Sequence, residues 1–250
     1  NYNYTNGGLS LRLGYQKISR DFQSDFPFQT ASENNQVELF NKYVFNNRIY
    51  TVVGTLIQKN YADYQQGQQT TQSDFFANVV TEFTDQIRIN FGGRWNSHSN
   101  YGSHFTYSLN PSIQIFDKNQ SKLKFQAAYS TAFIAPSLYQ LFDPFSGNLD
   151  LQPEENTSFE TGLVYMLKKW ELSGTYFNRI ESPSLIYDLA TYRYENATDQ
   201  ARYYGVEAIL SGGIGSKLIL DHQMTFTETR DGDLRYLPNF SAPTRLTDSF

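Results

Sequence analysis

Hydrophobic residues in this chain recur at every second position, and this alternation constrains the fold more than any other feature. The segment 9–15 reads Leu-Ser-Leu-Arg-Leu-Gly-Tyr, and similar alternation occurs at 87–95, 122–129, 170–176 and 204–210. A period of two gives a β-strand one apolar face and one polar face, whereas the helical spacing of i, i+3, i+4 is hard to find. The pattern predicts an antiparallel all-β protein of about a dozen strands.

The connections between these strands alternate between short and long. Short turns are predicted at 46–47, 85–86, 117–120, 168–169 and 212–215, and longer connections at 18–35, 60–72, 98–103, 132–156, 188–191 and 230–243. This rhythm places all turns at one end of a sheet and all loops at the other. A bacterial outer-membrane β-barrel has this segregation, with short periplasmic turns and long extracellular loops. A soluble sandwich gives no reason for it.

Composition narrows the classes of protein further. The 250 residues include no cysteine, carry a formal net charge of −5 and have a mean hydropathy of −0.54. The acidic balance argues against a nucleic-acid partner, and the lack of cysteine excludes a disulfide scaffold and a cysteine-ligated metal. No stretch approaches the ~18 consecutive apolar residues of a spanning helix. Low hydropathy suits a transmembrane barrel, because only alternate residues face lipid.

Charged residues within the strands are predicted to face the barrel lumen, since a charge facing lipid at the bilayer midplane costs ~2–4 kcal/mol. The residues assigned to the lumen in this way are Arg12, Arg88, Arg94, Lys122, Lys124, Glu160, Glu171, Arg202 and Glu207. Aromatic residues near strand ends, such as Tyr15, Trp95 and Tyr176, suit the girdles at the two membrane interfaces.

Residues 127–165 carry a motif that resembles the hallmark segment of TonB-dependent outer-membrane receptors. A strand ends in Tyr-Ser-x-x-Phe-x-Ala-Pro, a loop follows with Leu-Tyr-x-Leu-Phe and Gly-Asn-x-x-Leu-x-Pro-Glu, and the next strand contains Glu-x-Gly. A second stretch, 195–207, is similar to the family's Asn-x-x-x-Ala-Arg-x-x-Gly-Val-Glu strand. The motif residues expected to hold structure are Phe133, Ala135, Pro136, Gly147, Asn148, Pro153, Glu154, Gly205 and Glu207. The compact Pro-Phe-x-Gly-Asn loop is most similar to the cobalamin (vitamin B12) receptor branch.

The resemblance implies a location in the bacterial outer membrane and a transport function without covalent chemistry. Family members pair a plug domain with a barrel of about 22 strands. Residues 1–250 are therefore expected to form a central-to-late part of the barrel, with the plug and the first and last strands outside this chain. Two unpaired edges would be left in lipid, so the sheet is expected to close with other segments or another chain. The implied partners are lipid, the plug and, through the plug, the TonB complex.

Aromatic residues of the long connections are the candidates for ligand contact, because flat amphipathic rings suit a large planar or corrinoid ligand. These candidates are Tyr61, Tyr64, Tyr139, Phe142, Phe145, Tyr187 and Tyr192. Packing of these rings on one another or on a surface partner explains their presence equally well. Pro136, Gly147, Asn148 and Pro153 are expected to shape the loop instead.

Several alternatives stay open at this point. Cobalamin is the first candidate ligand, and a ferric siderophore or haem is the second. A soluble carbohydrate-binding or adhesive β-module is a different class of protein. The three histidines are not spaced as a zinc site, and no nucleophile, phosphate-binding or dinucleotide motif is present, so no catalytic residue and no cofactor is expected. Calcium in the loops, and a surface lipoprotein over them, are possibilities to which no residues are assigned.

Overall fold

A computed structural model describes residues 1–23, 27–64, 67–215, 217–232 and 234–248. The predicted all-β class is confirmed, with one short helix among the described residues. The strands are β1 (Tyr2–Tyr4), β2 (Gly7–Phe22), β3 (Phe28–Asn46), β4 (Ile49–Ala62), β5 (Gln68–Glu82), β6 (Ile87–His98), β7 (Gly102–Lys118), β8 (Ser121–Ile134), β9 (Glu154–Leu167), β10 (Trp170–Glu181), β11 (Leu185–Asp188), β12 (Arg193–Asn196), β13 (Ala201–Ile214), β14 (Leu218–Asp231), β15 (Leu234–Arg235), β16 (Asn239–Ser241) and β17 (Thr244–Asp248), and the helix is α1 (Leu138–Phe142).

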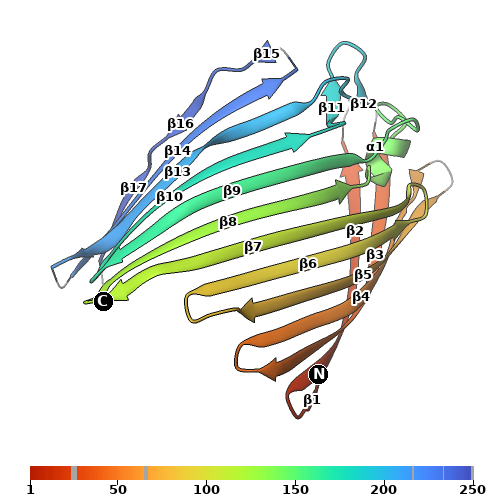
Figure 1. Cartoon of the computed structure of the whole chain (residues 1–250). Coiled ribbons are helices and arrows are strands. Elements are labelled where there is room, and N and C mark those ends of the chain that lie inside the picture. The colour runs from red at the N-terminus through yellow and green to blue at the C-terminus, as the bar shows by residue number, and fades with distance from the viewer. Residues whose placement is uncertain (24–26, 65–66, 216, 233, 249–250) are drawn as a thin grey trace.

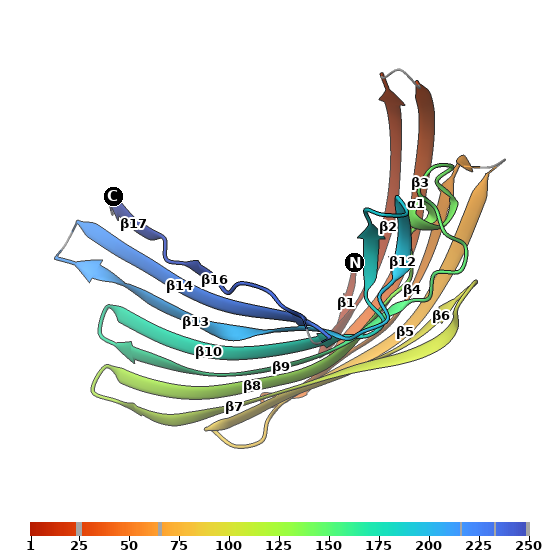
Figure 2. The same ribbon diagram turned by 90° about the horizontal axis from the view of Figure 1, so that it is seen from above.

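The strands form one antiparallel sheet in which sequence neighbours pair. The order runs from β1 through β10 without interruption and continues through β13 to β14, along whose far side β15, β16 and β17 pair in turn. The sheet curves into an open trough, with β1 and β2 at one side and β14 with its short partners at the other (Figures 1 and 2). Within the described residues these two sides are not paired with each other. No helix in this part of the chain is long and apolar enough to cross a membrane.

The alternation of the sequence separates the two faces of the trough. On the convex face, Leu39, Phe75, Trp95 and Phe105 lie in one row across β3 to β7, with Thr55 of β4 between the first two, and all four are exposed. On the concave face, Asp74 is buried and accepts hydrogen bonds from Asn96 Nδ2 (2.5 Å) and Arg94 Nη1 (3.2 Å). An apolar convex face and a polar concave face are the arrangement of a barrel wall in lipid.

The predicted rhythm of connections is confirmed, but the strands extend farther than predicted at the loop end. Strand β2 continues to Phe22 and β3 begins at Phe28, so most of the predicted loop 18–35 is strand. The predicted loop 98–103 is a connection of three residues, 99–101. Polar residues outside the hydrocarbon are wet on both faces, so the strand continues there without alternation. Residues 24–26, 65–66 and 233, inside three predicted loops, and 249–250, in the last predicted strand, lie outside the described residues.

Two expectations about the last third of the chain are wrong. The predicted connections 168–169 and 188–191 imply one strand over 170–187, but this strand ends at Glu181, and β11 and β12 form a separate two-stranded hairpin, so that β10 pairs directly with β13. Pro183 lacks the amide proton that a continuing ladder needs. Arg202 lies on the convex face rather than the lumen side, because it is directly opposite Ile180 and Arg230 and shares the parity of Val206. The charge of Arg202 had suggested the lumen, whereas the alternation of β13 places this residue on the convex face.

Candidate ligand-binding site

The connection between β8 and β9, residues 135–153, holds the helix α1 at the loop end of the trough (Figure 1). Ser137 and Gln140 form a capping box, in which the Ser137 side chain accepts from the Gln140 amide (3.2 Å) and Gln140 Oε1 accepts from the Ser137 amide (2.8 Å). Such reciprocal bonds start a helix in a short segment. Leu138 and Leu141 are buried, and α1 contacts β4 and β5 across the concave face. We call residues 135–153 the α1 loop.

The second half of the α1 loop is fixed by one buried carboxylate. Asp143 Oδ2 accepts hydrogen bonds from the amides of Phe145 (3.1 Å) and Ser146 (2.9 Å) and from the Ser146 hydroxyl (2.7 Å). Gly147 follows, and a Cβ at this position would lie 2.5 Å from the Asp143 carbonyl oxygen. The chain turns too tightly here for any side chain, so glycine is required.

The α1 loop is fastened to the β11–β12 hairpin, about 46 residues later in the sequence. Asn148 Nδ2 donates to the Tyr194 carbonyl (2.8 Å), Arg193 donates to the Gly147 carbonyl (2.9 Å), and the Tyr194 amide donates to the Ser146 carbonyl (3.0 Å). These bonds hold the two extracellular segments as one unit.

A third connection joins this unit from the β6–β7 turn. The Tyr101 hydroxyl donates to the carbonyl of Leu151 (3.1 Å), a residue that is 1% exposed. Burial raises the pKa of the Tyr101 phenol, which keeps it protonated as a donor. Gln152 and Asn196 form two further hydrogen bonds. The Gln152 amide donates to Asn196 Oδ1 (2.7 Å), and Asn196 Nδ2 donates to the Gln152 carbonyl (3.0 Å).

Four tyrosines form a continuous row across this unit. Ring centroids lie 6.2 Å apart for Tyr64 and Tyr139, 5.9 Å for Tyr139 and Tyr194, and 5.2 Å for Tyr194 and Tyr187. These separations are typical of interacting aromatic pairs. Burial is the largest cause that raises the pKa of Tyr194, and the neighbouring Tyr139 adds to it. Neighbouring rings are inclined to each other by 57°, 76° and 65°, so the row presents ring edges and faces together with phenolic hydroxyls.

A cavity of about 530 Å³, lined by two members of this row, lies between the start of the α1 loop and the concave face of β2 to β6. Its wall is rich in neutral amides and hydroxyls, among them Gln16, Asn34, Asn60, Thr70 and Gln72, with Tyr64 and Tyr139 at its rim. Asn34 Nδ2 donates to Asn60 Oδ1 (2.6 Å). Arg20 and Glu33 both belong to its lining, but the Glu33 side chain pairs with Lys17 on the convex face, so the wall offers chiefly neutral polar groups to a ligand.

The structure brings some of the sequence-predicted aromatics together and separates others. Tyr64, Tyr139 and Tyr187 belong to the row, and Phe142 ends α1. Tyr61 lies inside strand β4 rather than in a loop, and Tyr192 lies at the exposed hairpin tip. Phe145 contacts Phe28 (6.1 Å between centroids), which stacks on Phe22 (4.4 Å).

Sequence reasoning missed Tyr194, Phe28 and Tyr101. Tyr194 was predicted to be part of a long strand, and Phe28 was inside a predicted loop from which no aromatic was selected. Tyr194 is directly opposite Tyr187 in the β11–β12 hairpin, a pairing that appears only once 185–196 is recognised as a hairpin.

The residues of the family motif have mostly structural contacts. Phe133 stacks on His104 (3.8 Å between centroids), and Glu154 lies 4.0 Å from Arg179 on the concave face. A Cβ at Gly205 would collide with the Phe226 carbonyl oxygen on the neighbouring strand. The remaining motif residues Ala135 and Pro136 lead into α1, Pro153 precedes β9, and Glu207 is opposite Thr175 and Thr225 on the concave face.

Acidic and histidine side chains do not gather into a metal site in the described part of the chain. No group of three or more His, Asp or Glu residues there could hold a metal ion. The buried Asp143 is fully engaged by backbone and hydroxyl donors of its own loop.

Known proteins similar to this chain are outer-membrane receptors and transporters. The vitamin B12 transporter BtuB of Vibrio cholerae is 28% identical over 234 residues, which cover 90% of this chain and 36% of that protein. The iron-regulated outer membrane virulence protein of the same species is 29% identical over 65% of this chain and 28% of that protein. The chain thus spans about a third of the length of these relatives.

Solved structures share the fold at lower sequence identity. The siderophore receptor PirA from Pseudomonas aeruginosa superposes with a TM-score of 0.79 at 17% identity, covering 98% of this chain and 51% of that chain. The copper transporter OprC superposes with a TM-score of 0.78 at 14% identity, covering 98% and 47%. The family described as "TonB dependent receptor-like, beta-barrel" matches residues 1–247. The chain therefore belongs to the TonB-dependent receptor family of the bacterial outer membrane.

Proposed function

We propose that this chain forms part of the wall and the extracellular binding surface of a receptor that takes up a corrinoid, cobalamin first among them. The observation that carries the proposal is the cavity that Tyr64 and Tyr139 of the tyrosine row help to line, with a wall rich in neutral amides. A corrinoid is large, close to planar and edged with amide groups. Tyrosine faces and side-chain amides are complementary to both features.

The scarcity of charged side chains in the cavity favours this ligand over a ferric siderophore. Arg20 is a single cation among neutral polar groups of the lining, since the Glu33 side chain pairs with Lys17 on the convex face. A ferric complex of an anionic siderophore carries negative charge and favours an excess of cations. The vitamin B12 transporter relative also covers more of the chain than the iron-regulated relative does. The siderophore is the second candidate ligand.

In this proposal the concave face contacts a plug domain and the protein catalyses no covalent step. Ligand binding at the loop end precedes movement of the plug, which the TonB complex energises from the inner membrane. The ion pair of Arg94 with the buried Asp74, and Glu160 and Glu207 farther along the sheet, then face the plug or lumen water. The proposed partners are thus the rest of the barrel, the plug domain and the TonB complex.

The test is a calorimetric titration of the whole receptor that contains this chain, purified in detergent. Cyanocobalamin is titrated with calcium present and again with a chelator, and a ferric siderophore is the comparison ligand. We expect saturable binding of cyanocobalamin and a loss of about tenfold in affinity in Tyr139→Ala, since a stacked aromatic contributes roughly 1 kcal/mol or more. Tyr15→Ala, which removes an exposed ring from the convex face, is the matched control.

Three outcomes would contradict parts of the proposal. If the siderophore binds and cyanocobalamin does not, the receptor function would stand and the corrinoid would be the wrong ligand. Equal losses in Tyr139→Ala and Tyr15→Ala would overturn the site. A folded receptor that binds neither ligand would overturn the corrinoid proposal and its alternative together.

A further inference from the structure

Three arginines lie directly opposite one another on adjacent strands of the convex face, near its loop end. Arg202 of β13 is in register with Arg230 of β14, and Arg230 is in register with Arg235 of β15. Directly opposite residues of antiparallel strands project from the same face with their Cβ atoms about 5 Å apart. Like charges in this arrangement destabilise a sheet, so the row requires a compensating anion.

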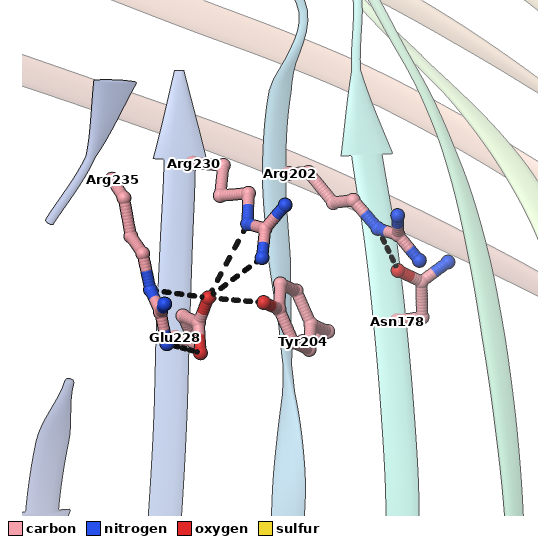
Figure 3. Close-up of polar contacts among 6 residues, drawn as sticks. All are labelled: Asn178, Arg202, Tyr204, Glu228, Arg230 and Arg235. Carbon is pink, nitrogen blue, oxygen red and sulfur yellow. Dashed lines mark hydrogen bonds and ion pairs between the residues drawn. The ribbon is translucent and has the colours of Figure 1, made fainter. Parts of the chain in front are cut away.

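Among the described residues, one carboxylate pairs with two of these three cations. Glu228 accepts from Arg230 Nη2 (3.2 Å) and Arg235 Nη2 (2.9 Å), and from the Tyr204 hydroxyl (Figure 3). Arg202 donates through Nε to Asn178 Oδ1 (2.6 Å), a neutral acceptor. The six residues therefore carry a net charge of about +2 at neutral pH, since arginine stays protonated.

The guanidinium groups are accessible, although their carboxylate is not. The side chains of Arg230 and Arg235 are 48% and 62% exposed, and that of Glu228 is 7% exposed beneath them. Both Arg202 and Arg230 also lie over the Tyr204 ring, 5.1 Å and 5.6 Å from its centroid. The ring and the carboxylate hold the three guanidinium groups in place, and each retains donors for another acceptor.

The position of the arginine row along the membrane normal shows which layer of the bilayer surrounds it. Tyr176, Val206, Phe226 and Phe240 lie in register as an exposed apolar row on the same face. The arginine row is four residues farther toward the loop end, about 14 Å along the strand at ~3.4 Å per residue. With strands tilted by ~40°, it lies about 10 Å farther out along the membrane normal. The headgroup layer lies immediately outside the hydrocarbon core.

From this arrangement we propose that Arg202, Arg230 and Arg235 bind the phosphate group of a lipid in the outer leaflet. Guanidinium groups recognise phosphate oxygens through paired, charge-assisted hydrogen bonds. The apolar row below accommodates the acyl chains of the same lipid. A phosphate on a lipid is favoured over a free anion, because the row lies beside a lipid-facing surface.

The other side of the trough provides an internal contrast. Lys17 on the convex face of β2 is paired with Glu33 of β3 (2.8 Å), one cation with one anion. This pair carries no net charge, in contrast to the net charge of about +2 of the arginine row and its partners.

The test uses the whole receptor in detergent and native mass spectrometry or calorimetry with defined lipids. The probe is a short-chain phosphatidate, and the comparisons are diacylglycerol with the same chains and inorganic phosphate. We expect phosphatidate to bind, diacylglycerol to bind at least about tenfold more weakly, and Arg202→Gln/Arg230→Gln/Arg235→Gln to lose the preference, because charge-assisted hydrogen bonds contribute strongly. Binding should also weaken as salt concentration rises.

Arg88→Gln/Lys122→Gln/Lys124→Gln is the matched control, since it removes the same charge from the concave face. Equal losses in both triple variants, or an unchanged preference in the convex variant, would overturn the proposal. Inorganic phosphate that competes with phosphatidate at equal concentration would overturn the lipid as the source of the phosphate. Arg202→Gln alone, whose partner Asn178 is neutral, retains the test if the triple variant does not fold, and should itself weaken phosphatidate binding.

Discussion

The two faces of the sheet differ in which residues they expose, although every strand contributes to both faces. On the convex face Leu163 is 48% exposed, whereas its neighbour Val164 is opposite Lys124 and Ser173 on the concave face. On the concave face Asp74 is 2% exposed and ion-paired. The face and the depth of a position, rather than the residue type, therefore determine what a charge costs here.

Leu163→Arg is expected to have the largest effect. It places a charge in the central part of the convex face, where burial in lipid costs ~2–4 kcal/mol. Val164→Arg, one residue later, points to the concave face and should cost far less. The measurement is the urea midpoint of folding of the whole receptor into lipid vesicles, followed by heat-modifiable migration on gels. Similar losses in the two variants would break the assignment of faces.

Asp74→Ala is expected to have the next largest effect, about 2 kcal/mol of unfolding free energy, because it removes a buried, charge-assisted network. Arg94 and Asn96 would lose their acceptor. Asp117→Ala is the control, since its pair with Lys122 (2.9 Å) is about half exposed on both sides and should contribute about 0.5 kcal/mol or less. Equal thermal stability of the two variants in detergent would show that burial of Asp74 contributes nothing.

Glu207→Leu is expected to have a smaller effect, about 1 kcal/mol or less, on the contact between the barrel wall and the plug. Glu207 is opposite Thr175 and Thr225 on the concave face, so the leucine would not enter lipid. We expect unchanged insertion into vesicles and faster proteolysis of the plug in the whole receptor. Impaired insertion with a protected plug would reverse the face assigned to Glu207.

Much of the barrel wall could be predicted from the sequence, because lipid and lumen impose alternation directly on each strand. The segment 87–95 alternates, and β6 occupies it. The prediction failed where that physical constraint ends. Residues 29–35 are mostly polar on both faces and were taken for a loop, and Arg202 was placed in the lumen because of its charge. Outside the hydrocarbon, a charge on the convex face costs little.

The candidate site was predictable only in its local parts. The family motif located the α1 loop, and Ser137 and Gln140 have the spacing of a capping box. The bonds that join Asn148 to Tyr194 connect segments about 46 residues apart, and no local pattern signals such a contact. The tyrosine row could be identified only once β11 and β12 had separated from the main sheet.

The smallest expected effect concerns the ionisation of Tyr194 at the mouth of the concave face, in the hairpin above the membrane. Burial raises the pKa of this phenol, so its neutral form is favoured in the folded protein. The contribution of the neutral phenol to the free energy of unfolding is therefore complete at a pH below about 10, the ordinary pKa of tyrosine. This contribution is lost as the pH rises through the pKa in the folded protein. The measurement is the phenolate absorbance of the whole receptor during alkaline titration, with Tyr194→Phe subtracted. A difference curve with an ordinary or lowered midpoint would show that Tyr194 is as accessible to water as the hairpin tip at Tyr192. The tyrosine row would then offer a corrinoid no surface shielded from water.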